Sequence, residues 1–400
     1  MIEETKSAIH QTPIQIFLRF LRFGFLAFGG PVAQIAMLKQ ELVEEEMWVS
    51  REEFNRALAV YQALPGPEAH ELCVWLGMIA GGRWGGFLAG LGFMLPGFAL
   101  ILGLSWVYFT YGVDYPILQS LFLGFQVAVI ALIFNAVKRI GQHAITSKAL
   151  FIAAVIAAVC VFLGVSFIIV LIAIGLAYAL YINKQKVLAL IAPALLLAYG
   201  LYLFNQQNTH VLSSTTHVQA EHVIASPGDV FFTGLKAGLL TFGGAYTSIP
   251  YIEQDAVRKY HWLSEKQFLD GIAFSGVLPA PLIIFSTFVG YAASGWLGAF
   301  LITIGIFFPA FSFTLLGHGF FQRLIENKSI HGFLDGVTAA VIGIIAVTAI
   351  KLFIGVIDTW VSVALFLVSL FILLKFKSKL VPVFALLVSG LLMVLYGLIK

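Results

Sequence analysis

The sequence predicts an all-α polytopic membrane protein of about 13 spans (10–13), built as two inverted repeats with broken helices. Three observations support this fold class: the composition, a long series of apolar runs and an internal repeat. Hydrophobic residues make up 60% of the 400 residues and charged residues only 11%. Soluble domains carry roughly 25% charged residues. With a mean hydropathy of +0.96, the chain is an integral membrane protein.

The internal repeat divides the chain into two halves. Phe28-Gly29-Gly30-Pro31 is matched 214 residues later by Phe242-Gly243-Gly244-Ala245. At this shift, without a gap, 15 of the 44 positions from Gly24 to Pro67 are identical. The matched positions include Trp48 with Trp262, Pro65 with Pro279 and Pro67 with Pro281. We infer that the chain arose by tandem duplication.

Apolar runs of spanning length occur in both halves. The first half contains them at about 14–38, 57–82, 84–110, 116–137, 149–164, 166–183 and 187–204. The second half contains them at about 230–252, 270–293, 296–320, 331–351, 354–374 and 380–399. We therefore predict a first transmembrane repeat over 1–204, a polar linker over 205–229 and a second transmembrane repeat over 230–400.

Lysine and arginine indicate the orientation, because short cytoplasmic loops are enriched in both. The linker 205–229 contains neither residue, so we expect it to be external. Counting from there, the turn near Gly164 and the loop Lys39–Arg56 lie outside, and the N-terminus and Arg258 lie inside. Lys351 and Lys400 do not fit this scheme. The two Gly-Gly stretches then face opposite ways, which is the inverted-repeat arrangement of many secondary transporters.

The two Gly-Gly pairs predict helix breaks, since glycine weakens a helix and permits positive φ angles. Pro31 follows the first pair directly, and proline suits the first turn of a new helix. An open backbone inside a bilayer is tolerated where it is buried in protein or lines a cavity. Because the break occurs in both halves, we interpret it as a binding site. The alternative is a notch for close helix packing.

Two cations lie near these breaks. Arg22 and Lys236 are equivalent in the repeat, and each stands seven residues before the first glycine of its pair. An anion at the break could be held by free backbone N–H groups, helix N-terminal dipoles and these side chains. The alternative is that Arg22 and Lys236 extend to the membrane interface.

The second constellation is Pro65-Gly66-Pro67-Glu68, with Pro279-Ala280-Pro281 as its partner. Paired prolines break a helix, so the run 57–82 either crosses the bilayer or returns as a re-entrant hairpin, which would change the span count. A carboxyl group in apolar surroundings can carry a proton, and Glu68 is the proton-coupling candidate. For His70 and Glu71 we favour a structural role, with the side chains hydrogen-bonded at the new helix start.

Enzyme signatures are missing from the sequence. It contains no His-Glu-x-x-His pair, no Gly-x-Ser-x-Gly and no phosphate-binding loop. Cys73 and Cys160 lie in apolar segments and are interpreted as core residues. The formal net charge of +3 is too small to indicate nucleic acid. We expect no enzyme activity, no cofactor and no metal.

In combination, these residues resemble the chromate ion transporter family in its long two-domain form. The resemblance rests on Phe28-Gly29-Gly30-Pro31, Trp48-x-Ser50, Leu64 to Ala69 and Phe242 to Tyr246. It implies a bacterial inner-membrane carrier that confers chromate resistance by moving chromate outward, with sulfate as a related oxyanion. It also implies thirteen spans in an antiparallel arrangement. The sequence departs from the family at Gln34, where a histidine is expected, and at Ala280 in the second Pro-x-Pro.

We therefore predict a secondary oxyanion transporter that works by alternating access, with its N-terminus cytoplasmic, the lipid bilayer around it and a possible homodimer. The alternatives are a carrier or channel for another small solute and a membrane scaffold or enzyme. The predicted substrate-binding residues are Arg22, Gly29, Gly30, Pro31, Gln34, Pro65, Gly66, Pro67, Lys236, Gly243, Gly244, Pro279 and Pro281.

Overall fold

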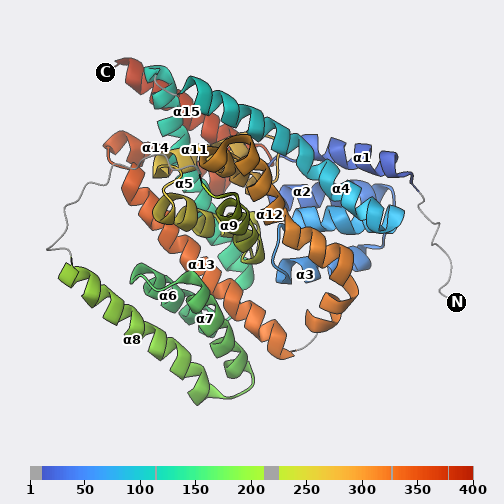
Figure 1. Cartoon of the computed structure of the whole chain (residues 1–400), viewed down its shortest axis with the longest axis horizontal. Helices are drawn as coiled ribbons and strands as arrows, with labels where there is room; N and C mark the ends of the chain where they lie inside the picture. The colour runs from blue at the N-terminus through green and yellow to red at the C-terminus, as the bar shows by residue number, and fades with distance from the viewer. Residues whose placement is uncertain (1–10, 113–114, 211–224, 326–327, 377, 400) are drawn as a thin grey trace.

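The computed structural model describes residues 11–112, 115–210, 225–325, 328–376 and 378–399, and in these ranges it is helical without strands (Figure 1). The first half contains α1 (Pro13–Phe25), α2 (Pro31–Leu38), η1 (Lys39–Glu45), α3 (Arg51–Ala63), α4 (Glu68–Tyr111), α5 (Pro116–Ala144), α6 (Lys148–Phe162) and α7 (Phe167–Ile182). After α8 (Lys186–His210), the second half contains α9 (Pro227–Leu239), η2 (Ala245–Ser248), α10 (Ile249–Glu253), η3 (Gln254–Lys259), α11 (Glu265–Val277), η4 (Leu282–Ile284), α12 (Phe285–Ile325), α13 (Lys328–Val356), α14 (Trp360–Lys375) and α15 (Val381–Ile399).

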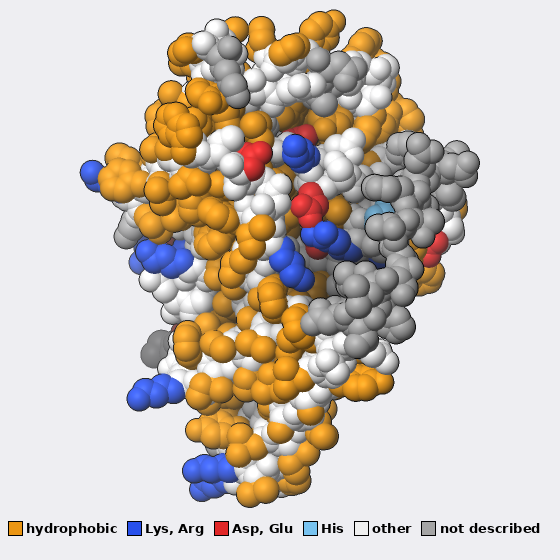
Figure 2. Space-filling model, turned by 90° about the vertical axis from the view of Figure 1, so that its left-hand side faces the viewer, with side chains coloured by type: hydrophobic (Ala, Val, Ile, Leu, Met, Phe, Trp, Pro, Cys, Tyr) orange, Lys and Arg blue, Asp and Glu red, His pale blue; other side chains and the backbone are white. Residues whose placement is uncertain are grey.

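Helices of membrane-spanning length dominate the molecule. In the described ranges, six helices are long and apolar enough to cross a bilayer, and α6, α7 and α14 are shorter apolar helices. Hydrophobic side chains cover much of the described part of the face shown in Figure 2, and charged side chains are gathered in a few places. A surface of this kind is suited to lipid contact. The prediction of an all-helical multi-pass membrane protein is confirmed.

The element order repeats across the two halves. Each half contains a Gly-Gly break, a π-helical segment, a capped helix, a Pro-x-Pro break and a long kinked helix. Capping boxes begin α3 and α11, because the side chains of Ser50 and Ser264 both accept the N3 amide while the side chains of Glu53 and Gln267 accept the N-cap amide. Within the predicted linker 205–229, α8 extends to His210 and α9 begins at Pro227. Residues 211–224 of that linker lie outside the described residues.

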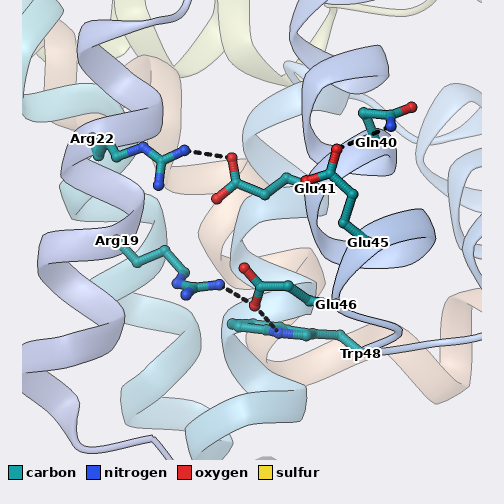
Figure 3. A network of polar contacts seen from close by, with 7 residues as sticks. All are labelled: Arg19, Arg22, Gln40, Glu41, Glu45, Glu46 and Trp48. Atoms are coloured by element: carbon teal, nitrogen blue, oxygen red, sulfur yellow. Dashed lines mark hydrogen bonds and ion pairs between the residues drawn. The ribbon is translucent and has the colours of Figure 1, made fainter.

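Each Gly-Gly stretch is the tip of a helical hairpin. Arg22 pairs with Glu41, and Arg19 pairs with Glu46, so α1 and the α2–η1 segment run antiparallel (Figure 3). One equivalent contact joins the second hairpin, in which Lys236 pairs with Asp255. The runs 14–38 and 230–252 therefore each reverse direction within the run and are not single continuous helices. Two successive glycines with positive φ reverse the chain instead of only interrupting it.

A second hairpin follows in each half. The α4 segment folds back at Gly81-Gly82, where Gly82 has a φ of +62°, and Gly77 then packs against Gly85. The amide of Gln11 donates to the carbonyl of Ala80, so this turn lies beside the start of α1. The start of α3 is there as well, since Trp48 packs against Phe20. The Pro65-Gly66-Pro67 break is thus the inner tip of a hairpin made by α3 and the first part of α4.

The second half contains the same kind of hairpin, but its turn lies at the opposite end of the molecule. The α12 segment turns at Ser294-Gly295, and Ala225 donates its amide to the carbonyl of Ala293. At the far end of α4, the ring of Phe109 stacks on Tyr291, with centroids 5.8 Å apart. The turn of α12 therefore lies beside the end of α4, whereas the turn of α4 lies beside α1.

Helices of each half pack against helices of the other half. The α5 helix of the first half packs against α14 and α15 of the second, and α13 of the second half packs against α6 and α7 of the first. The repeat boundaries predicted from sequence therefore mark duplicated segments that fold around each other. The α8 helix, which has no counterpart, packs mainly on α7 at the edge of the molecule (Figure 1).

One cavity corrects the predicted loop assignment. A cavity of about 550 Å³ is lined by Gly164, Arg258, Glu265 and Lys351, among others. Gly164 was expected outside and Arg258 inside, which is wrong because these residues share one end of the molecule. The reason is that the Gly-Gly and Pro-x-Pro runs fold back on themselves as hairpins, so counting each run as one straight span misplaces the loops that follow.

Candidate anion-binding site

The tips of the first hairpin in each half have the same backbone geometry. Gly29 and Gly30 have φ angles of +86° and +78°, and Gly243 and Gly244 have +77° and +111°. L-residues with side chains rarely adopt these angles, so glycine is required there. At each tip one helix ends, and the next begins directly after the second glycine.

Hydrogen bonds join each Gly-Gly tip to the Pro-x-Pro tip of the other half. The buried Gln34 donates from Nε2 to the carbonyl of Ala27 at 2.9 Å and to that of Ala280 at 3.2 Å. The amide of Gly66 donates to the carbonyl of Thr241 at 2.8 Å. Ala27 and Thr241 are equivalent in the repeat. The four breaks predicted from sequence are therefore brought together by crossed contacts between the halves.

Four helical segments begin at this junction. Their N-cap residues are Gly30, Pro67, Gly244 and Pro281, and none provides a side-chain cap. The first N–H groups of a helix have no partner within the helix, and the N-terminal end of its dipole is positive. Uncapped N-termini that converge in this way are suited to binding an anion.

The space between the tips is small in this conformation. A cavity of about 20 Å³ is lined by Gly29, Gly30, Tyr246, Ala280 and Leu282, with Leu132, Ser275, Gly276, Leu278 and Pro382. This volume holds about one water molecule. The hairpin tips are therefore closed on each other, and the cavity in this conformation is too small for an ion larger than water.

Glu68 begins its helix at the same junction. Its side chain is buried, with 7% of the residue exposed, and hydrogen-bonds to Gln62, which lies at the surface. A Cβ placed on Gly244 would lie 3.6 Å from Oε1 of Glu68, so the carboxyl group faces the second Gly-Gly tip. The residue predicted to couple protons is therefore close to the predicted anion site.

The two predicted cations are engaged elsewhere. Arg22 is 2.6 Å from Glu41, and its side chain is 58% exposed (Figure 3). Lys236 pairs with Asp255, which is the repeat equivalent of Glu41. Both cations hold their hairpin arms together. The structure thus brings the predicted Gly-Gly, Gln34 and Pro-x-Pro residues to one junction but places Arg22 and Lys236 in ion pairs at its side.

Two features of the site region were not found from the sequence. The buried Asp270 accepts hydrogen bonds from Tyr108 and Gln126. An acidic residue at the start of the apolar run 270–293 was the signal available for it. Glu71 was expected to be hydrogen-bonded at the helix start, which is wrong: it is fully buried, and neither carboxyl oxygen has a hydrogen-bond partner.

Comparison of the sequence with known proteins places the chain in a family. The family model described as chromate transporter matches residues 14–180 and again 228–394. The chain belongs to the chromate transporter family. Membership makes it a transporter rather than an enzyme, and the double match agrees with the internal repeat. No solved structure matches the chain.

Named relatives of this chromate transporter family member match over nearly their whole length. The chain is 49% identical to a chromate transport protein of Pseudomonas aeruginosa over 94% of the chain and 91% of the relative. It is 32% identical to that of Cupriavidus metallidurans over 93% and 91%, respectively. It is 29% identical to a probable chromate transport protein of Synechococcus elongatus over 86% of both chains.

Proposed function

We propose that this protein is a secondary transporter that moves chromate, and sulfate as a related oxyanion, by alternating access. The observation that carries the proposal is the crossed contact of the four breaks, in which Gln34 reaches Ala280 and Gly66 reaches Thr241. Uncapped helix N-termini meet there, and a multiply charged anion is the ligand that such termini favour. The names of the relatives point to the same solute.

The proposed binding residues are the two Gly-Gly tips with Pro31, Gln34 and the two Pro-x-Pro tips. Backbone N–H groups would hold the anion, as they do at other helix N-termini. Arg22 and Lys236 have an indirect role in this proposal. Each fixes a hairpin through its ion pair and adds positive potential without touching the anion. Their partial exposure and their carboxylate partners favour this role.

We further propose an inverted arrangement of the two halves. If both hairpins of each half are re-entrant, the crossing segments are the second parts of α4 and α12 together with α5, α6, α7, α8, α13, α14 and α15. Five crossings then precede the second half, which makes its hairpins enter from the opposite side. This gives fewer crossings than the thirteen expected from the sequence.

The proposed location is the bacterial inner membrane with the N-terminus in the cytoplasm. In the proposed topology the cytoplasmic side carries Arg83 at the turn of α4, Lys138 and Arg139 near the end of α5, Lys148 at the start of α6 and Lys184 between α7 and α8. Such an excess of basic residues marks the cytoplasmic side. A homodimer stays a prediction, which light scattering of the purified protein in detergent can test.

Flux measurements test the proposed function. Purified protein in liposomes should accumulate radiolabelled chromate, and unlabelled sulfate should compete. Protein-free liposomes and liposomes with an unrelated helical membrane protein are the controls. Flux of another solute without chromate competition would favour the alternative carrier, and the absence of any solute flux would favour a scaffold.

Cysteine labelling tests the inverted arrangement. Met47→Cys and His261→Cys change equivalent positions at the base of the first hairpin in each half. A membrane-impermeant maleimide should label His261→Cys in spheroplasts and Met47→Cys only after permeabilisation. The native Cys73 and Cys160 are buried and give a low background. Labelling of both variants from the same side would contradict the inversion.

A further inference from the structure

Glu71 is a buried acid that contacts the Pro65-Gly66-Pro67 tip. Its side chain is fully buried, and neither oxygen has a hydrogen-bond partner. A Cβ placed on Gly66 would lie only 2.8 Å from Oε1 of Glu71. The amide of the same Gly66 donates to Thr241 in the other half. Glu71 therefore lies against Gly66, whose amide makes one of the hydrogen bonds that join the two halves.

Glu68 connects this acid to an exposed side chain. Glu68 and Glu71 are three residues apart on one helix, which places them on the same face. Glu71 is fully buried, whereas Glu68 hydrogen-bonds to the surface residue Gln62. Glu68 also faces Gly244, the second tip of the proposed anion site. The two carboxyl groups thus form a short path from the surface, past the anion site, to the junction.

The repeat shows that packing does not require these acids. At the equivalent positions the second half carries Leu282 and Phe285, both buried. Apolar side chains fill the same place in the same fold, so the two acids are an addition to the first half alone. Burying a carboxyl group is costly, and an acid kept without a structural need indicates a function.

The surroundings of Glu71 provide no cation. The titratable groups facing it are Tyr61 on α3 and Glu68 on its own helix. His70 is turned toward α12, where its ring lies between Phe307 and Phe311. Among the described residues no lysine, arginine or histidine pairs with Glu71. A proton is therefore the means of neutralising this side chain in the closed conformation.

We infer that Glu71 binds a proton that is transported together with the anion, and that Glu68 passes this proton to and from water. The inference rests on the proposed function. An ionised Glu68 beside Gly244 repels an anion, so protonation of the pair favours anion binding, and anion binding favours protonation by the same factor. A doubly charged anion with one proton still carries a net negative charge, so a potential that is negative inside drives it outward.

Accumulation in liposomes tests the inference. Chromate is supplied outside at one constant pH, the membrane potential is clamped with potassium and valinomycin, and only the internal pH is varied. An internal pH about one unit higher should raise steady-state accumulation about tenfold per coupled proton. Glu71→Gln should still equilibrate chromate but lose this pH response. Glu253→Gln, which changes a buried acid at the base of a hairpin, should keep it.

A wild-type response in Glu71→Gln, or a wild-type protein that equilibrates chromate without any pH response, would overturn the inference. A wild-type protein without chromate flux would instead overturn the proposed function, and the inference with it. If Glu71→Gln does not reach the membrane, Glu71→Leu copies the apolar character of the second half. A pH indicator trapped in wild-type liposomes provides one more measurement. Chromate entry must acidify the interior, and entry without acidification also overturns the inference.

Discussion

The hydroxyl of Tyr108 donates a hydrogen bond of 2.7 Å to the carboxylate of Asp270, and this bond joins the two halves. Tyr108 belongs to α4 of the first half, and Asp270 belongs to α11, an arm of the second hairpin of the second half. Gln126 on α5 donates to the other carboxylate oxygen at 2.8 Å. Two long helices of the first half thus fix the position of a hairpin that belongs to the second.

Tyr108→Phe should destabilise the protein. The change removes one of two donors from a buried carboxylate, which costs about 1.5–3 kcal/mol because a charged acceptor is left less well satisfied. Thermal unfolding in detergent measures the loss. Tyr115→Phe, at a side chain that is 69% exposed, serves as the control and should unfold like the wild type. Equal unfolding temperatures for Tyr108→Phe and the wild type would show that the bond contributes little.

Gly66→Ala should impair both folding and transport. Gly66 has a φ of +153°, and an added Cβ would meet the carboxyl group of Glu71 at 2.8 Å. Either the backbone or Glu71 must move, and the bond to Thr241 is then strained. Chromate flux per folded protein should fall about tenfold, which corresponds to about 1.4 kcal/mol. Gly103→Ala, where a Cβ meets open space, should retain normal flux.

Gln34→Leu should separate the first Gly-Gly tip from the second Pro-x-Pro tip. The change leaves the carbonyls of Ala27 and Ala280 without this donor, at a cost of about 1–3 kcal/mol. Gln34→His keeps an N–H donor and should retain more flux and stability than Gln34→Leu. Equal defects in both variants would show that size, and not hydrogen bonding, sets the role of this position.

A charge exchange tests the role of Arg22. Arg22→Glu alone places two like charges opposite each other in the first hairpin and should reduce flux. The double variant Arg22→Glu with Glu41→Arg restores an ion pair with the charges exchanged. We expect its flux to recover to within about threefold of the wild type. Exposed pairs contribute only about 1 kcal/mol, so the exchanged pair should replace the original one at little cost. If flux in the folded double variant stays as low as in Arg22→Glu, Arg22 acts directly on the anion.

Much of the site could be predicted from residues alone. The matched glycine and proline breaks identified the four segments that meet at the junction, since glycine and proline act on the local backbone wherever they stand. The roles of Arg22 and Lys236 could not be predicted this way. Their partners, Glu41 and Asp255, lie 19 residues further along the chain in each half, and only the reversal of the hairpin brings them close.

The sequence by itself determined the membrane environment, the duplication and the position of every break, because composition, identity at a fixed shift and backbone preference are local properties. The tertiary structure decided that the breaks are hairpin tips, that each tip contacts the other half, and that Glu71 is buried without a partner. These relationships depend on contacts between residues far apart in the chain. A hydropathy pattern reads the same whether an apolar segment crosses the bilayer or turns back within it.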